Sequence, residues 1–171
     1  MDCVSRVKSA LDGSLSGCVL SSCGIYRYAL WRIWDFSKPL WMMALLNPSK
    51  ATEEQSDPTI TRCCIRAQKG GAGGIVVVNT GAIRETNAEK ACRAPDPIGP
   101  HNAQWIEALI PTCQTHIAGW GPNASSFGGD KIILEIFRRR NVPLYALKVN
   151  RDGSPRHPLY VAYDAPLMFL K

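Results

Sequence analysis

The chain has 171 residues, of which 46% are hydrophobic and 20% are charged, the balance of an ordinary globular domain. This length suits one domain with a real core and is short for two. No apolar run approaches the roughly 20 residues that cross a bilayer, and the first residues lack the basic and apolar regions of a signal peptide. We therefore expect a cytoplasmic protein with no membrane association.

The cysteines do not predict a metal site. Their number is odd, seven, and none is spaced Cys-x-x-Cys as in zinc and redox sites. Cys63 and Cys64 are adjacent on a predicted helix, so they point in different directions. We expect most cysteines to be small buried hydrophobic residues, although a catalytic cysteine paired with a histidine stays open. We expect no metal and no cofactor.

The first part of the chain gives weak signals. Residues 1–24 contain several serines and glycines without clear periodicity, and we expect a short helix or a loosely packed arm ahead of a single domain over residues 25–171. Residues 26–34 alternate aromatic residues with arginines. This alternation predicts an edge or antiparallel strand with one wet face.

A strand and a helix follow with stronger signals. The continuous apolar run over residues 40–46 is typical of a strand buried on both faces, as in a parallel sheet. Residues 58–69 are predicted to form a helix, with Asp57 as its N-cap and Pro58 in its first position. The glycines that begin at Gly70 end this helix.

The rest of the chain continues to alternate strands with helices. Such alternation implies right-handed crossovers and a mostly parallel sheet with helices on both faces, a three-layer α/β/α fold. We expect strands at 74–78, 115–119 and 143–149, and helices at 101–109 and 129–140.

Polar residues stand at the ends of several predicted strands. The strand over residues 40–46 is followed by Asn47, Pro48 and Ser49, and the next strand is followed by Asn79. Trp120 follows a third strand, and His157 lies beyond the last one. In open α/β sheets, ligands bind where the strands end. One edge of the sheet is therefore predicted to carry the site.

Asn79 and Arg84 follow the same strand. The amide of Asn79 offers a donor and an acceptor, enough to read one edge of a base or an amide bidentately. Arg84 could hold a phosphate or a carboxylate. The alternatives are an Asx-type turn for Asn79 and a surface position for Arg84.

Three further residues each have a functional and a structural interpretation. Asp57 is either a general base that orients water or only the N-cap of its helix. Trp120, flanked by glycines, either stacks on a planar ring or belongs to the core. His157, fixed by Pro158, can donate to a developing negative charge or transfer a proton, although a lone histidine is usually structural.

The net charge of +6 and the pI of about 9.0 come largely from the C-terminal third. Residues 131–156 hold seven basic residues against two acidic ones. Such a surface could follow a phosphate backbone or hold a nucleotide. The alternative for the arginines at 138–140 is a solvated helix C-terminus. The candidate phosphate-binding residues are Arg138, Lys148, Arg151 and Arg156.

The ordered motifs of the chain resemble the domain-of-unknown-function family 1643, whose members are bacterial and phage proteins. The resemblance covers roughly residues 23 to 168, and the family name implies no reaction. The motifs are Tyr26-Arg27-Tyr28, Leu45-Leu46-Asn47-Pro48-Ser49, Asp57-Pro58-Thr59, Val77-Val78-Asn79, Asp96-Pro97-Ile98-Gly99-Pro100, Gly119-Trp120-Gly121 and His157-Pro158-Leu159-Tyr160.

The order of these motifs is also similar, more distantly, to that of the uracil-DNA glycosylase superfamily. That resemblance implies a uracil-DNA-glycosylase-like fold. It places Asn47 in the water-orienting position of the first motif and Asn79 in the base-reading position. The late loop with His157 would contact DNA and stabilise the departing base as an anion.

The resulting hypothesis is an enzyme that hydrolyses an N-glycosidic bond in DNA or in a nucleotide. Asn79 would read the base, with Trp120 or Tyr160 stacked on it and Ser49 and Arg84 among the ligand-binding residues. Asn47, together with Asp57, would position the water. His157 would stabilise the leaving base.

Two other functions remain open. The same fold could be a binding module that recognises a nucleotide or modified DNA without catalysis, as in proteins of phage or mobile elements. A hydrolase with Ser49 or Cys64 as its nucleophile ranks last, because the chain has no Gly-x-Ser-x-Gly elbow and His157 has no paired acidic partner.

Overall fold

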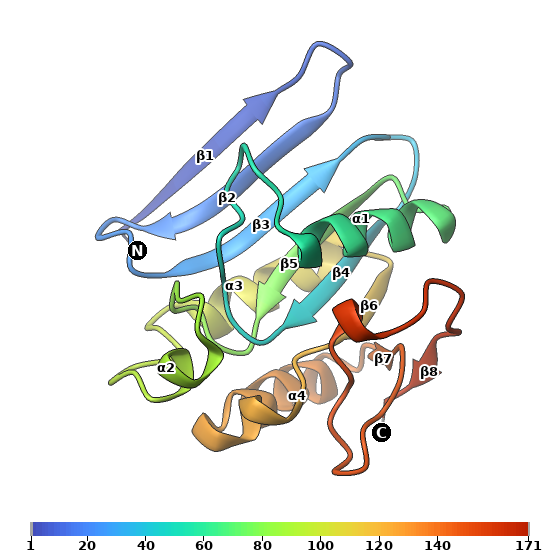
Figure 1. The fold of residues 1–171 in the computed structure, drawn as a ribbon. Coiled ribbons are helices and arrows are strands. Elements are labelled where there is room, and N and C mark those ends of the chain that lie inside the picture. Colours follow the sequence, from blue (N-terminus) through green and yellow to red (C-terminus); the bar gives the residue numbers. More distant parts are fainter. Residues whose placement is uncertain (1, 171) are drawn as a thin grey trace.

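A computed structural model describes residues 2–170, which form an α/β fold around one mixed sheet (Figure 1). The eight strands lie in the order β1-β2-β3-β5-β4-β6-β7-β8. Their bounds are β1 Cys3–Ser9, β2 Leu15–Ser21, β3 Arg27–Ile33, β4 Leu40–Leu45, β5 Gly74–Asn79, β6 Thr115–Ala118, β7 Tyr145–Ala146 and β8 Met168–Phe169.

Four α-helices and three short 3-10 helices connect the strands. The predicted helix over residues 58–69 is confirmed, and those at 101–109 and 129–140 are confirmed to within one residue. Among residues 2–170, no helix is long and apolar enough to cross a membrane. The bounds are α1 Pro58–Lys69, α2 Ala88–Cys92, α3 Asn102–Leu109, α4 Gly129–Arg140, η1 Ile110–Thr112, η2 Pro122–Phe127 and η3 Pro158–Tyr160.

Strand β4 is buried on both faces, as its unbroken apolar run predicts. Met43 and Leu45 pack into one part of the core, while Met42 and Ala44 pack into the other. Successive side chains of a strand point to opposite faces, so an apolar residue is needed at every position. Strand β5 follows the same pattern.

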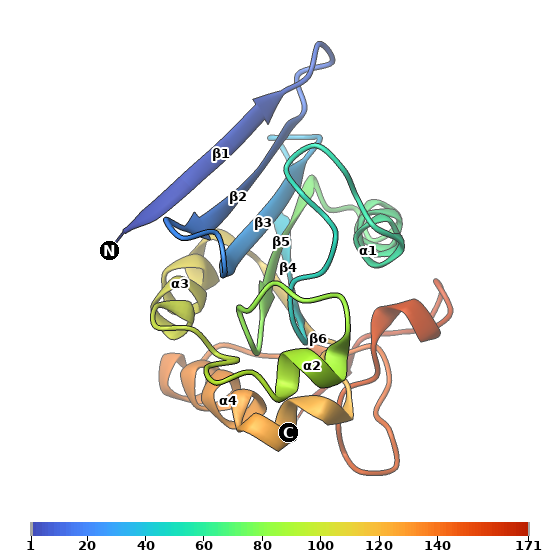
Figure 2. The same ribbon diagram turned by 60° about the vertical axis from the view of Figure 1, so that its left-hand side comes forward.

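Helices cover both faces of the central sheet. Ile60 of α1 packs with the Met43 side of β4, whereas Ile106 of α3 and Ile133 of α4 pack with the Met42 side. Figure 2 shows α1 on one side of strands β3, β5 and β4, and α3 and α4 on the other. The apolar stripe that each helix turns toward the sheet fixes this arrangement.

The prediction of a mostly parallel sheet is wrong. Strands β5, β4, β6 and β7 pair in parallel, which gives three parallel pairings. Four pairings are antiparallel: β1 with β2, β2 with β3, β3 with β5, and β7 with β8. The turns that join β1, β2 and β3 are too short for a crossover, whereas β3 with β5 and β7 with β8 pair across longer stretches of chain. Strand β3 is antiparallel as predicted, but it lies inside the sheet.

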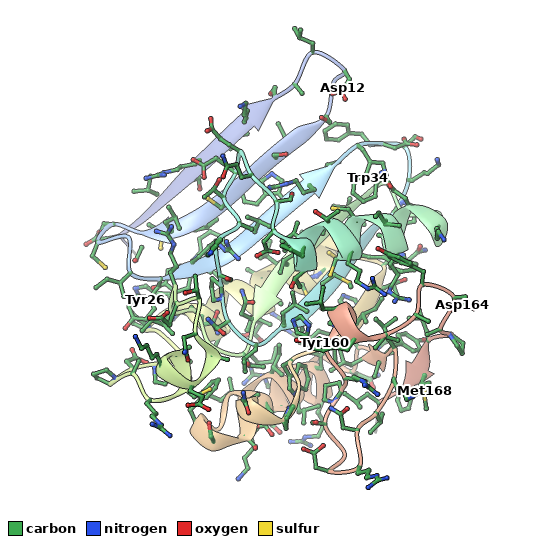
Figure 3. All side chains as sticks on the ribbon, in the orientation of Figure 1. Asp12, Tyr26, Trp34, Tyr160, Asp164 and Met168 are labelled. Carbon is green, nitrogen blue, oxygen red and sulfur yellow. The ribbon has the colours of Figure 1, made fainter. Side chains whose placement is uncertain are left out.

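The N-terminal segment differs from the expected short helix or loosely packed arm. It forms the β1–β2 hairpin, and Asp12 marks its projecting tip (Figure 3). In this turn Gly13 has a φ of 84°, and the Asp12 carboxylate accepts a hydrogen bond from the Ser14 N–H. Strand β2 pairs with β3, so the sheet continues across the predicted boundary at residue 24. The domain division itself stays a prediction.

The last strand predicted for the parallel sheet is much shorter than expected. Of residues 143–149, only Tyr145 and Ala146 form β7. Beyond them the ladder with β6 stops, and Val149 forms an isolated bridge with Pro155. The apolar run there packs against the core without continuing the ladder.

His116 of β6 is a buried titratable group with a structural role. It is 3% exposed, and its Nε2 lies 3.0 Å from the Ile110 carbonyl oxygen. Burial lowers its pKa below the ordinary value of 6.5, since the charged ring would lose its hydration.

We predict that His116 makes the protein acid-sensitive. Its pKa is lower in the folded state, so the unfolded chain binds more protons as the pH falls below the ordinary histidine pKa. The free energy of unfolding should therefore decrease between about pH 7 and about pH 5, and less steeply in His116→Gln. Urea denaturation at several pH values measures both slopes. Equal slopes would contradict this assignment.

Candidate functional site

A cavity of about 380 Å³ opens at the carboxyl ends of β4, β5 and β6. Seven of the residues predicted from the sequence line it: Asn47, Ser49, Asp57, Asn79, Trp120, His157 and Tyr160. The wall is completed by Arg27, Leu45, Leu46, Thr59, Ile60, Val77, Glu85, Thr86, Ala88, Gly121, Pro122, Asn123 and Leu159.

The path of the chain explains why the cavity lies here. After β4 the chain passes over one face of the sheet as α1, whereas after β5 and β6 it passes over the other face as α3 and α4. Connections that diverge in this way leave a crevice at the strand ends, where α/β proteins bind ligands.

A larger cavity of about 650 Å³ lies between α4 and the C-terminal strand β8. Its wall is mainly apolar, and Arg138 is the one predicted residue that lines it. A binding site needs convergent polar groups to orient its ligand. The smaller cavity has them, and we therefore place the candidate site there.

Asn79 lies at the buried end of the candidate site. It is 1% exposed, and neither Nδ2 nor Oδ1 of its side chain has a hydrogen-bond partner among residues 2–170. The alternative of an Asx-type turn is therefore wrong for this residue. Unpaired buried amide groups are unfavourable, and native proteins keep few of them.

The backbone around Asn79 is firmly held. Asn102, at the start of α3, donates from Nδ2 to the Asn79 carbonyl at 2.9 Å. Thr80 donates from its hydroxyl to the Leu46 carbonyl at 2.9 Å, which ties the ends of β5 and β4 together. The unpaired amide therefore has a rigid support.

Asn47 has a structural role through its side-chain Nδ2, and its side-chain oxygen has no partner among the described residues. Its Nδ2 donates to the Glu85 carbonyl at 2.6 Å and to the Pro48 carbonyl at 3.0 Å. These bonds join the turn after β4 to the segment after β5. The acceptor Oδ1 stays available for water or a ligand.

Asp57 caps α1, as the sequence predicts. One carboxylate oxygen, Oδ1, accepts a hydrogen bond from the Ile60 N–H at 2.9 Å. The other oxygen makes no hydrogen bond within the described chain. A carboxylate has room for several donors, so the cap does not exclude a second role toward a ligand.

His157 is oriented by its own backbone turn. Its Nδ1 accepts a hydrogen bond from the Leu159 N–H at 3.3 Å, which leaves the neutral ring with its proton on Nε2. Burial lowers the pKa of His157, and the nearby Asp57 carboxylate opposes part of that effect. The ring is therefore neutral at pH 7 and acts as a hydrogen-bond donor.

The turn that carries His157 is locked in place from two sides. A Cβ at Gly119 would lie 2.7 Å from the Pro158 ring, so only glycine allows this approach at the end of β6. Arg62 of α1 donates to the Pro158 carbonyl at 3.1 Å and to the Val161 carbonyl at 2.9 Å. The turn is thereby fixed to β6 and to α1.

The two predicted stacking residues have different environments. Trp120 is buried in the core on the α4 side and also lines the cavity, so its core interpretation is confirmed and its stacking role stays a prediction. Tyr160, labelled in Figure 3, belongs to η3 and is 69% exposed. Its ring centroid lies 5.9 Å from that of His157. It forms the outer part of the site.

None of the predicted basic residues lines the candidate site. Arg84 donates to the Gly24 carbonyl at 2.9 Å and borders a neighbouring shallow depression. Arg138 makes two hydrogen bonds with Glu135, at 2.7 and 2.9 Å, as expected for a solvated helix C-terminus. Lys148, Arg151 and Arg156 lie in the segment that leads to His157. They make no ion pair in residues 2–170, and their phosphate-binding role stays a prediction.

Sequence reasoning missed Arg27, the first residue of β3. The alternation over residues 26–34 predicts that its arginines face water, but Arg27 is 3% exposed and lines the cavity. Its Nη1 donates to the Ala51 carbonyl. Burial lowers its pKa from 12.5 to about 10, so it remains cationic at pH 7. In the sequence, the tyrosines on either side of Arg27 are the one indication that this arginine is not on an exposed face.

In the part of the chain that the structure describes, no group of three or more histidine, cysteine or acidic side chains could hold a metal ion.

Comparison with known proteins adds one finding. The family described as "Protein of unknown function (DUF1643)" matches residues 27–159. The chain belongs to this family. The matched range includes every residue of the cavity wall except Tyr160. The search of curated proteins and the search of solved structures gave no match.

We predict that the cap and the charge of Asp57 can be separated by substitution. Asp57→Ala should lower the free energy of unfolding by about 1 kcal/mol, because α1 loses its side-chain cap. Asp57→Asn should stay within a few tenths of a kcal/mol of the wild type, since asparagine caps equally well. Urea denaturation measures both. An equal loss in the two variants would show that the charge, not the cap, stabilises the fold.

Proposed function

We propose that the cavity binds a nucleobase and that the protein hydrolyses the N-glycosidic bond of a nucleotide or nucleic acid. The observation that carries this proposal is the rigidly held, unpaired amide of Asn79 at the buried end of the cavity. One donor and one acceptor side by side match the N–H and C=O edge of a base.

The arrangement of the motifs supports a relationship with the uracil-DNA glycosylase superfamily. Asn47 follows β4, Asn79 follows β5, Trp120 follows β6, and His157 lies in the late loop. All four line one cavity. We extend the proposal to the fold, as a three-layer α/β/α arrangement of that type whose parallel part is limited to strands β5, β4, β6 and β7.

Recognition of the base would depend on burial as well as on hydrogen bonding. Leu45, Ile60 and Val77 form an apolar wall beside Asn79, and Tyr160 stands at the outer end. A base with the complementary edge would satisfy the unpaired amide, whereas one without it would leave the amide buried and unpaired. Sites of this kind discriminate strongly between related ligands.

In the proposed reaction, a water molecule attacks C1′ of the sugar. Asn47 Oδ1 and the free oxygen of Asp57 hold this water, and the Asp57 carboxylate accepts its proton. The C1′–N bond breaks, and its electron pair stays on the base. The Nε2–H of His157 donates a hydrogen bond to the departing base, and the Asp57 charge stabilises the cationic sugar.

The alternative is a module that binds the base without hydrolysis. This alternative is favoured because both candidate water-positioning residues already have structural roles. Asn47 ties two loops together, and Asp57 caps α1. For both functions, Lys148, Arg151 and Arg156 are proposed to contact phosphate.

We predict opposite effects of Asn79→Leu on stability and binding. Leucine is close to asparagine in shape and has no polar atom, so the free energy of unfolding should rise by about 1 kcal/mol. Binding of a base should weaken by about tenfold or more, because its hydrogen-bond partner is gone. Thermal unfolding with and without uracil, cytosine, adenine and guanine measures both effects.

Asn102→Leu is the matched control for this prediction. It removes donors to the Asn79 and Thr80 carbonyls, so it should lower stability. Loss of stability in Asn79→Leu would show that its amide is satisfied in the free protein.

We predict that Asp57→Asn and His157→Gln separate hydrolysis from binding. Single- and double-stranded DNA and nucleotides carrying uracil or modified bases are incubated with each protein, and released base is measured by mass spectrometry. Each variant should release base about a hundredfold more slowly than the wild type while binding it equally well. Binding by the wild type without release would replace the hydrolase by the binding module. Absence of both would exclude a nucleobase ligand.

A further inference from the structure

Arg27 lies at the buried end of the candidate site, close to the position proposed for the base. It shares the cavity wall with Asn79, Ile60 and Val77, each of which is buried. Strand β3 runs antiparallel to β5, and this brings the first residue of β3 to the carboxyl end of β5. A charged side chain thus lies in a largely apolar part of the cavity.

The guanidinium group of Arg27 is far from satisfied. Nη1 donates to the Ala51 carbonyl, while Nε is buried and has no partner in residues 2–170. Arg27 takes part in none of the ion pairs found in residues 2–170. No carboxylate of those residues therefore lies within 4.0 Å of its guanidinium nitrogens. A guanidinium carries N–H donors in a fixed planar fork, and here most of them remain for another group.

A purely structural role does not account for this burial. Arg32, on the same strand, already holds the loop over residues 51–56 through the Thr52 and Gln55 carbonyls. Arg32 is only half-buried and does not line the cavity. The Asp57 charge favours the cation from beyond ion-pair distance, and the bond to Ala51 satisfies one donor, so most N–H groups of this buried guanidinium still lack a partner within the described chain.

We infer that Arg27 binds a negatively charged oxygen of the base, beside the amide of Asn79. This inference rests on the proposed function. When the C1′–N bond breaks, the electron pair passes to the base, and part of the negative charge lies on its carbonyl oxygens. The guanidinium donates hydrogen bonds to that oxygen, and no proton needs to move to or from Arg27.

Arg27 thereby supplies what His157 lacks. The neutral imidazole offers an N–H donor but no charge, whereas the guanidinium keeps its charge at every physiological pH. Hydrogen bonds to charged groups are roughly twice as strong as those between neutral groups, and more so away from water. The ligand class is therefore a base that can leave, or bind, as an anion.

The test uses uracil and 5-nitrouracil, which is largely anionic at neutral pH, as probes of the full-length protein. Calorimetric titration should show that the wild type binds 5-nitrouracil about tenfold more tightly than uracil. In Arg27→Gln this preference should disappear, while uracil still binds. Each ligand is compared across the variants, so the steric effect of the nitro group cancels.

Two further variants keep the test independent of folding. Arg27→Lys retains a cation and should keep part of the preference. Arg32→Gln removes an arginine that holds the same loop from outside the cavity, so it should keep the full preference. Inorganic phosphate is titrated in parallel, as a probe of anions that are not bases.

Each contrary outcome identifies which proposal fails. An unchanged preference in Arg27→Gln, with uracil bound, would overturn the role of Arg27 and leave the proposed function standing. Phosphate binding that depends on Arg27, with no preference between the two bases, would overturn it in favour of a phosphate site. Failure of the wild type to bind either base would overturn both proposals.

Discussion

Burial of β4 on both faces is the constraint on which the rest of the structure depends. Because each of its positions needs an apolar side chain, polar groups can appear only beyond its end, at Asn47. The neighbouring strands β5 and β6 run parallel to it and end at the same edge. The divergence of α1 from α3 and α4 then opens the cavity where these ends meet. The position of the candidate site therefore follows from the packing of apolar side chains in the core.

The cavity holds two polar groups that oppose stability, the amide of Asn79 and the guanidinium of Arg27. Both persist because their surroundings are over-determined by bonds that do not involve a ligand. Asn102 fixes the backbone of Asn79, and the backbone N–H of Arg27 donates to the Ala82 carbonyl. A rigid shell around unsatisfied groups is the arrangement expected of a preorganised site, which binds a ligand without first having to order itself.

The sequence predicts the central part of the fold and seven residues of the cavity wall, because those signals are local. The apolar run of β4 and the Asp57-Pro58 cap of α1 need no knowledge of the rest of the chain. The misses are non-local. Whether a strand joins its neighbour in parallel depends on pairing partners, and β1 is too exposed to carry an apolar pattern. The alternation places Arg27 on a wet face, but in the folded chain the loop after β4 covers it.

The boundaries of the family match separate the centre of the sheet from its margins. The match begins at the first residue of β3 and ends within η3, so the β1–β2 hairpin lies beyond one end and β8 beyond the other. These strands form the two outer margins of the sheet, and neither contributes to the cavity wall. A sheet can gain or lose marginal strands while the chemistry at its centre is preserved. The sheet can therefore change in width at its margins, or carry separate attachments there, without altering the wall of the cavity.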